Sequence, residues 1–392
     1  MILTRFFTQA KALMGIISGS MAFGGPLRTT IHLTNRCNLR CIPCFYHSPY
    51  LEKPNTTEVR RARYENIEIP EKDYCNFMNL EADYEKTKNL IDELISFGSY
   101  RFQFSGHGEV FLYKNFIDLS ERIIYAGREV FCFTNGTLMD KSIIDRLIEI
   151  KFNELWISVL AGTEEMYDLI HPGVKPGTFS VLRDNLLYLY EKKKSLKRVY
   201  PKITLIYVVM KENYKGLMDF ARFAASVKAD KVLYNPVDEV NDKNLSRLKL
   251  NEEEIKYVRE EMDHVMDYLD REEIKHNIKY FLSVFSGHLD TEKYYNNIPC
   301  YYGWLSNITD VAGNVYPCCR CYTPLGNIYE KTFKEIWNDK PYREFRNKTL
   351  NLRIKKDFPE SCDCNSCVNY SVNARVYRIL NPFKEIGLSH KL

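Results

Sequence analysis

The sequence predicts an α/β fold in which a parallel sheet curves into an open, partial (βα)6 TIM-like barrel. Short apolar runs alternate with amphipathic stretches from residue 30 to about residue 237, an alternation typical of βαβ units. In such a barrel the chemistry lies at the C-terminal ends of the strands. We expect strands at 30–34, 101–105, 130–134, 154–159, 203–210 and 231–235. We expect helices at 84–97, 116–126, 142–150, 179–192 and 214–227.

Residues 1–28 precede the barrel as an N-terminal extension. Arg5 and Lys11 flank the apolar run 12–17, a pattern that resembles a weak signal peptide. The run is short and broken, and a cysteine motif that export would oxidise follows it at once. We therefore expect an amphipathic helix packed on the domain. No stretch of the sequence reaches the roughly 18–20 apolar residues that a membrane span needs.

The remaining segments divide the chain around the barrel, which we place at 29–240. Residues 45–80 form a long polar insertion, and we expect either a lid over the site or an ordered loop. The linker 241–297 contains an acidic stretch with a helical pattern at 248–269. It leads to a small C-terminal module at 298–370, and residues 371–392 form a tail.

Composition and cysteine usage narrow the class of protein. The 55 Lys and Arg residues nearly balance the 51 Asp and Glu residues, so the net charge of +4 gives no reason to expect a nucleic acid or an anionic membrane as partner. A chain of 392 residues builds its own core, so its 12 cysteines do not indicate a secreted disulfide scaffold. Most of them fall into two groups, with Cys75 and Cys132 apart, which indicates metal ligands in the reducing cytoplasm.

The first cysteine group directly follows the first predicted strand, with the spacing Cys37-x3-Cys41-x2-Cys44. Three thiolates this close can bind three irons of a [4Fe–4S] cube and leave the fourth iron open to another ligand. The alternative is a zinc site. Structural zinc sites normally take four protein ligands in CxxC-type pairs, which this spacing fits poorly.

This motif resembles the CxxxCxxC signature of the radical S-adenosylmethionine (SAM) superfamily. The resemblance implies that the amino and carboxylate groups of SAM chelate the open iron, and that reductive cleavage of SAM releases a 5′-deoxyadenosyl radical. The sequence departs from the family at Pro43, where an aromatic residue is usual. Phe45 and Tyr46 follow the last cysteine of the motif and are candidates to replace it.

Further matches to the family fall at successive strand ends. Residues 105–109 resemble the family's GGE motif, residues 134–137 resemble its TNG segment, and one serine ends the fourth strand. The resemblance implies close backbone approach at the glycines and a glutamate that accepts from the SAM ammonium. His107 is a candidate catalytic base, but we expect it to be an ordinary loop residue. The residues implied in SAM binding are Gly106, Gly108, Glu109, Thr134, Asn135 and Ser158.

The second cysteine group resembles the SPASM and twitch modules, which carry auxiliary [4Fe–4S] clusters in radical SAM enzymes. The shared features are a hairpin turned at Gly313, between cysteines, and a following helix with Ile336 and Trp337. The short final cysteine series favours a one-cluster, twitch-type arrangement. Cys364-x2-Cys367 would also suit a zinc ribbon. The implied cluster ligands are Cys300, Cys318, Cys364 and Cys367, with Cys319, Cys321 and Cys362 as substitutes or bystanders.

Three functions follow as expectations. The first is an oxidoreductase-type radical SAM enzyme that abstracts hydrogen from a small polar metabolite or sugar, with a flavodoxin or ferredoxin as reductant and net oxidation through the auxiliary cluster. The second is a peptide- or protein-modifying maturase. Leader-binding domains often precede the barrel in such enzymes, whereas here the first cluster cysteine is already residue 37. The third is a non-catalytic iron–sulfur electron carrier. Asp238 and Glu239, after the sixth strand, are candidate acids, bases or substrate anchors.

Overall fold

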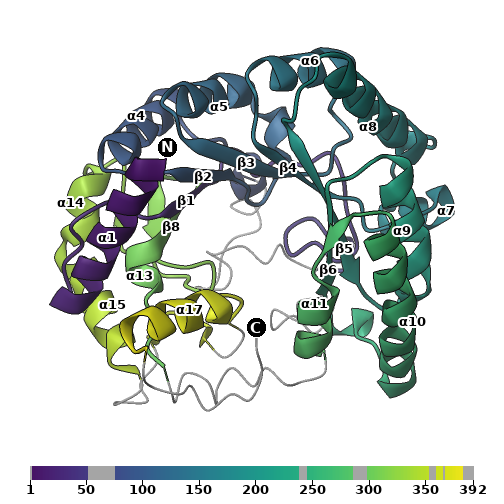
Figure 1. The fold of residues 1–392 in the computed structure, drawn as a ribbon. Coiled ribbons are helices and arrows are strands. Elements are labelled where there is room, and N and C mark those ends of the chain that lie inside the picture. Colours follow the sequence, from purple (N-terminus) through teal and green to yellow (C-terminus); the bar gives the residue numbers. More distant parts are fainter. Residues whose placement is uncertain are drawn as a thin grey trace.

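A curved parallel sheet forms the centre of the molecule, and its helices lie on the outer side of the curve (Figure 1). The computed structural model describes residues 2–51, 76–237, 245–285, 298–352, 359–364 and 367–382. Strands β1 to β6 are parallel neighbours in chain order, which confirms the predicted α/β partial barrel. These strands are β1 (Arg28–Ile31), β2 (Arg101–Phe104), β3 (Glu129–Thr134), β4 (Glu154–Ser158), β5 (Lys202–Val209) and β6 (Lys231–Pro236).

The first strand lies earlier in the chain than the sequence predicts. β1 ends at Ile31, and the extended residues that follow change partners. The backbone N–H of Ala82 donates to Leu33 O at 2.9 Å, and Thr34 forms an isolated antiparallel bridge with Glu81. The apolar run was therefore correctly predicted as extended, but its second half pairs with the segment before the first barrel helix.

The five predicted barrel helices are all present, and each buries one apolar side against the sheet. They are α4 (Tyr84–Ser96), α5 (Phe116–Tyr125), α6 (Lys141–Glu149), α8 (Thr178–Ser195) and α9 (Leu217–Ser226). A further short helix, α7 (Glu164–Ile170), was not predicted, because only Tyr167 and Ile170 of its seven residues are buried. Its start is set by Thr163, whose hydroxyl accepts from Met166 N.

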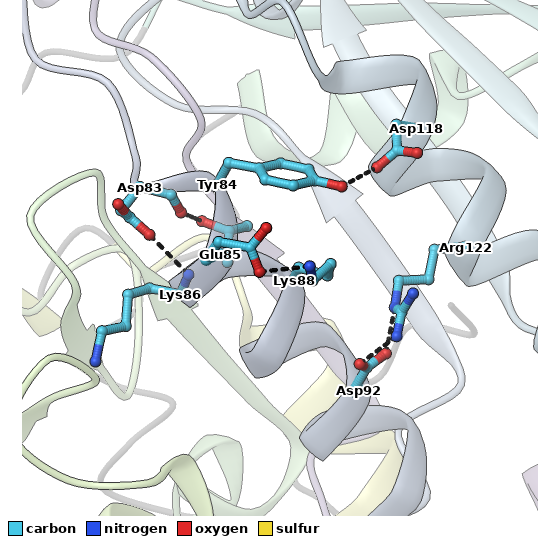
Figure 2. A network of polar contacts seen from close by, with 9 residues as sticks. Asp83, Tyr84, Glu85, Lys86, Lys88, Asp92, Asp118 and Arg122 are labelled. Carbon is cyan, nitrogen blue, oxygen red and sulfur yellow. Dashed lines mark hydrogen bonds and ion pairs between the residues drawn. The ribbon is translucent and has the colours of Figure 1, made fainter.

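Polar contacts join the outer faces of α4 and α5 (Figure 2). The Tyr84 hydroxyl donates to Asp118 at 2.6 Å, and the guanidinium of Arg122 donates to both carboxylate oxygens of Asp92. Asp83 caps α4 by accepting from Lys86 N at 2.8 Å. Exposed ion pairs contribute little free energy, so we assign the helix packing to the buried apolar sides and only the alignment of the two helices to these contacts.

The C-terminal module extends the same sheet from its β1 edge. β8 (Ser306–Thr309) pairs with β1 in parallel, and the antiparallel strands β9 (Asn314–Tyr316) and β10 (Gly326–Asn327) follow it outward. The turn between β8 and β9 contains Gly313 at φ +80°, which confirms the predicted glycine-turned hairpin. At the opposite edge, β7 (Lys275–His276) pairs with β6.

The helices outside the barrel flank the module and the linker. α1 (Ile2–Ser18) is the predicted N-terminal amphipathic helix, and α10 (Glu252–Arg271) is the predicted acidic linker helix, which starts at a capping box between Asn251 and Glu254. The chain beyond residue 370 begins with a packed helix, because the side chains of Tyr370, Ala374 and Tyr377 are buried. Among the described residues no helix is both long and apolar enough to cross a bilayer. Besides α1 and α10, the helices outside the barrel are α11 (Ile278–Phe285), α13 (Tyr302–Leu305), α14 (Phe333–Asn338), α15 (Lys340–Leu350) and α17 (Tyr370–Leu380).

Candidate active site

One cavity of about 590 Å³ lies at the C-terminal ends of β1 to β4 and reaches across to the module. Its volume falls within the range of ligand pockets, which is roughly 300–1,000 Å³. All three cysteines of the first group line one part of its wall. Cys318, Cys319 and Cys321 of the second group line another part. The fold thus brings both cysteine groups to a single cavity, although they are far apart in the sequence.

The loop that carries the first group is fixed by its own core contacts. Ile42, between two of the cysteines, is buried, and its N–H donates to Ile170 O at 3.0 Å. Burial raises the pKa of the Cys37 thiol to about 12 and also raises the pKa of Cys41 and Cys44. The Cys44 sulfur accepts from His47 N at 3.3 Å. Binding of metal to these buried thiols must therefore displace protons.

Gly106 and Gly108 are required by packing within the chain itself. Gly106 has φ +147°, and a Cβ there would lie 2.6 Å from Cγ of His32. A Cβ on Gly108 would lie 2.2 Å from Arg36 O, in the backbone just before Cys37. Such distances exclude any side chain, so the two glycines allow the β2 loop to lie directly against the loop that carries the first cysteine group.

Glu109 lies buried at the cavity wall, and groups of the same chain already bind its carboxylate. Oε1 accepts from the Thr134 hydroxyl at 2.6 Å and from Phe111 N at 3.2 Å, while Oε2 accepts from Asn135 N at 2.7 Å. Burial raises the pKa of Glu109, and these three hydrogen bonds oppose that rise. A carboxylate oxygen can accept more than one hydrogen bond, so Glu109 retains acceptor capacity towards a cationic ligand.

Asn135 connects the third strand end to the cysteine loop. Its Nδ2 donates to Asn38 Oδ1 at 2.9 Å and lies 4.0 Å from Cys37 Sγ. Its Oδ1 accepts from the Thr137 backbone and hydroxyl, which holds the amide in this orientation. Ser158, at the end of β4, also lines the cavity. The structure thus gathers all six residues implied in SAM binding at one wall.

His107 is a packing residue in this structure. Its ring lies 3.9 Å from that of Tyr46, 5.0 Å from that of His32 and 5.5 Å from that of Phe77, measured between centroids. Its carbonyl oxygen lies 2.9 Å from Nε2 of His47. This stack brings Tyr46 to the cavity wall beside Pro43 and Phe45, so both aromatic residues that follow the cysteine motif line the cavity.

The second cysteine group surrounds a small, separate cavity in the module. Cys300, Cys318, Cys364 and Cys367 all line it, and two asparagine side chains donate to the sulfurs. Asn369 Nδ2 lies 3.4 Å from Cys318 Sγ, and Asn373 Nδ2 lies 3.6 Å from Cys300 Sγ. Cys318 lines both this cavity and the larger one. The four predicted ligands are therefore gathered next to the main cavity.

The three remaining cysteines of the module differ from one another. Cys321 and Cys362 form a disulfide, and the backbones of their segments pair on either side of it. Cys319 is exposed and lines the main cavity. Among the described residues no three His, Cys, Asp or Glu side chains form a site for a single metal ion. The ligands of a [4Fe–4S] cube do not converge on a single metal ion, because each thiolate binds a different iron.

A hydrogen-bonded series of polar side chains that was not predicted from the sequence leads to the cavity, which Gln103 and Ser105 line. The guanidinium of Arg28 donates to Oε1 of Gln103, and Nε2 of Gln103 donates to Ser105 Oγ at 2.6 Å. Register could have suggested it, because Thr30 of β1 lies opposite Gln103 of β2 and alternate residues face the same side. Cys75, Asp238 and Glu239 lie outside the described residues, as does most of the 45–80 insertion.

Comparisons with known families agree with this geometry. Residues 31–224 match the radical SAM superfamily, and residues 300–368 match SPASM, an iron–sulfur cluster-binding domain. The chain is 26% identical to the tungsten-containing aldehyde ferredoxin oxidoreductase cofactor-modifying protein of Pyrococcus furiosus, over 86% of each chain. It is 23% identical to the subtilosin biosynthesis protein AlbA of Bacillus subtilis, over 93% of this chain and 72% of AlbA. It is 24% identical to a cysteine-type anaerobic sulfatase-maturating enzyme of Clostridium novyi, over 82% of each.

Solved structures show the same fold. Streptococcus suis SuiB bound to S-adenosylmethionine superposes with a TM-score of 0.58 at 16% identity, over 86% of this chain and 69% of SuiB. The structure of anSMEcpe with bound AdoMet and a peptide gives a TM-score of 0.55 at 18% identity, over 91% of this chain and 98% of that one. At these identities the likeness establishes the barrel and its C-terminal region.

Proposed function

We propose that this chain, which belongs to the radical SAM superfamily and carries a SPASM domain, modifies a peptide or protein substrate. Two relatives that align with most of the chain support this substrate class, one by its role in bacteriocin biosynthesis and one by its role in sulfatase maturation. The Pyrococcus relative modifies a cofactor, which keeps a small-molecule substrate as the second candidate. The peptide alternative thus has more support than the small polar metabolite expected first from the sequence.

The cofactors of the chain are SAM and [4Fe–4S] clusters. SAM bound at a cluster supplies a 5′-deoxyadenosyl radical, which removes a hydrogen atom from the substrate. In our proposal Cys37, Cys41 and Cys44 hold the SAM-binding cluster. The adjoining wall, from Gly106 to Ser158, orients SAM. The four cysteines of the module cavity that are not in a disulfide, Cys300, Cys318, Cys364 and Cys367, hold the auxiliary cluster. A flavodoxin or ferredoxin delivers the electron.

The observation that carries this proposal is the single cavity lined by both cysteine groups. A substrate segment bound there lies between the wall that carries Cys37 and the wall that carries Cys318. Hydrogen abstraction and electron acceptance would then occur on opposite sides of one bound segment. A cavity of about 590 Å³ must hold SAM as well, so only a short part of a larger substrate fits inside.

The test begins with anaerobic reconstitution, for which we expect about eight irons per chain as two [4Fe–4S] clusters. The reduced protein is incubated with SAM and with the short peptides and proteins encoded beside its gene. A parallel panel contains sugars and small polar metabolites. We expect a mass change in a peptide or protein, with formation of 5′-deoxyadenosine. Modification confined to the metabolite panel would overturn the substrate class.

Two controls separate the remaining alternatives. Replacement of Cys37, Cys41 and Cys44 by Ala should halve the iron and abolish SAM cleavage. Stoichiometric zinc in place of iron would refute the cluster assignment. A reconstituted, reduced protein that holds its clusters but never cleaves SAM would instead be an electron carrier.

A further inference from the structure

The ring of His32 lines the main cavity, at the point where β1 leads into the loop of the first cysteine group. Its Nδ1 is buried and has no hydrogen-bond partner among the described residues. Nε2 is therefore the ring nitrogen that His32 can offer to a ligand in the cavity. The mechanism proposed above gives this side chain no role.

Other polar side chains of the same wall are already bound by the protein itself. The carboxylate of Asp310 accepts from Asn314 N at 2.9 Å and from the Tyr316 hydroxyl at 3.1 Å. Nε2 of His47 lies 2.9 Å from the carbonyl oxygen of His107. These groups hold the neighbouring loops in place, whereas the nitrogens of His32 hold nothing in the described part of the chain.

Strand register places His32 beside Ser105. Thr30 of β1 lies opposite Gln103 of β2, and the pairing continues where Ser105 N donates to Ile31 O at 3.4 Å. The positions two residues beyond Thr30 and Gln103 therefore lie level with each other and face the same side. Ser105 also lines the cavity, and its hydroxyl accepts from Gln103, which leaves the hydroxyl hydrogen for a ligand. Neighbouring strands lie about 4.8 Å apart, so both side chains can reach one oxygen atom.

The His32 ring is neutral and presents an N–H to the cavity. Burial lowers its pKa to about 4, so at neutral pH the ring carries a single proton. A buried N–H without an acceptor is rarer in folded proteins than a buried acceptor without a donor, which favours the proton on Nε2 over the buried Nδ1. His32 and Ser105 thus form a pair of uncharged hydrogen-bond donors on one wall.

We propose that His32 and Ser105 together bind a carbonyl oxygen of the peptide substrate, and so position the residue from which hydrogen is removed. A carbonyl oxygen accepts two hydrogen bonds and donates none, which matches a pair of donors. A sugar hydroxyl would also need an acceptor for its own hydrogen, and the pair favours a carbonyl over it. This inference rests on the proposed function, since it takes the substrate to be a peptide.

The test is equilibrium binding of the peptide that the panel above identifies. The reconstituted holoprotein is used with SAM and with oxidised clusters, which prevents turnover. His32→Leu removes the donor, whereas the matched variant His32→Gln keeps an N–H donor on a side chain of similar reach. We expect His32→Leu to weaken peptide binding about tenfold and His32→Gln to weaken it less than about threefold.

A second measurement uses the wild type and peptides in which each carbonyl oxygen in turn is replaced by sulfur, a weaker acceptor. We expect one position at which sulfur weakens binding to the wild type but adds no further loss in His32→Leu, because the same hydrogen bond is removed in both. A wild type that tolerates sulfur at every position would overturn the inference, even if neither variant folds.

Iron content and SAM affinity verify that each variant keeps its clusters and its SAM wall. Equal losses of peptide affinity in His32→Leu and His32→Gln would overturn the inference and make the ring a packing residue. A fall in SAM affinity as large as the fall in peptide affinity would also overturn it. If only the metabolite panel reacts, the proposed function fails. The reactive metabolite is then the probe, and unchanged binding by His32→Leu would overturn the donor role separately.

Discussion

The hydroxyl of Thr134 donates to the buried carboxylate of Glu109 at 2.6 Å, and this contact joins the end of β3 to the loop after β2. The same hydroxyl accepts from Gly136 N at 2.9 Å, so it is directed into the protein. Glu109 thus holds the loop after β2 against the end of β3, a contact that we call the clamp. It is also the proposed partner of the SAM ammonium. The two roles can be separated by substitution.

Glu109→Ala should lower SAM affinity roughly tenfold to more than a hundredfold, since a charge-assisted hydrogen bond is worth about 1.5–3 kcal/mol. Thr134→Val removes the clamp but keeps the carboxylate. We expect it to cost about 1 kcal/mol of stability and to change SAM affinity less than about threefold. Calorimetry with SAM and urea unfolding measure the two effects. If Thr134→Val weakens SAM binding as much as Glu109→Ala does, the carboxylate acts only through the clamp.

Acid should destabilise the protein through His171. Its side chain is fully buried, its Nδ1 lies 2.8 Å from Tyr167 O, and burial lowers its pKa to about 4 from 6.5. The folded state therefore binds fewer protons than the unfolded state below pH 6.5. Titration of His171 therefore leaves the free energy of unfolding unchanged above that pH and lowers it progressively as the pH falls towards 4.

Because of this residue we expect the free energy of unfolding to be about 2 kcal/mol lower at pH 5 than at pH 7. Urea midpoints at the two pH values measure it, and His171→Gln should show a smaller difference because no imidazole titrates. An unchanged difference in the variant would assign the acid sensitivity to other groups, such as His32, whose pKa burial also lowers to about 4.

Arg346 should contribute strongly to stability. It is fully buried, and its Nε donates to Gly303 O at 2.9 Å while its Nη1 lies 3.3 Å from Ser20 O. Its guanidinium also lies 4.5 Å from the Trp337 ring centroid. A lysine ammonium cannot reproduce this planar set of contacts. We expect Arg346→Lys to cost about 2–4 kcal/mol in urea unfolding. A loss below about 0.5 kcal/mol, typical of an exposed site, would contradict this role.

The sequence predicts the six strands, the barrel helices and the two cysteine groups because these signals are local: apolar period, spacing and turn residues. It does not predict that β8 pairs with β1, which joins strands separated in the chain by the rest of the barrel and the whole linker. It also does not show that Thr134 and Asn135 bind Glu109, or that Arg28 reaches Gln103. Those contacts depend on which side chains face each other across neighbouring strands.

The hydrogen bonds that link Arg28, Gln103 and Ser105 predict that the Ser105 hydroxyl donates a hydrogen bond to the substrate. Arginine only donates, so Gln103 must present Oε1 to Arg28 and Nε2 to Ser105. Ser105 accepts that bond, which leaves its own hydroxyl hydrogen for a ligand in the cavity. Ser105→Ala should raise KM for the substrate about fivefold, equivalent to about 1 kcal/mol, and leave SAM affinity unchanged.

Gln103→Glu offers a sharper comparison. A carboxylate between Arg28 and Ser105 accepts from both, so the serine hydrogen would turn away from the cavity. We expect the same rise in KM although Ser105 is intact. Ser226→Ala is the control, since its hydroxyl donates to Phe223 O on α9, away from the cavity. If SAM affinity falls while substrate KM is constant, the hydroxyl binds SAM instead.

The electron that leaves the substrate needs an acceptor. Removal of a hydrogen atom leaves a substrate radical; loss of one more electron and one proton completes a two-electron oxidation. Cys318 lines both the main cavity and the module cavity, so an auxiliary cluster bound there would adjoin the substrate. Four cysteines would complete its coordination, so it needs no SAM and can act as the electron acceptor.

Cys364→Ala with Cys367→Ala should therefore leave formation of 5′-deoxyadenosine intact while product formation stops, as measured by chromatography of both products. Cys319→Ala is the matched variant, because this exposed cysteine lines the main cavity and is outside the four proposed ligands. It should retain the full iron content. If the double variant folds and forms product at the normal rate, the auxiliary cluster only stabilises the module. The cluster would then have the role of a metal in a small domain with little core of its own.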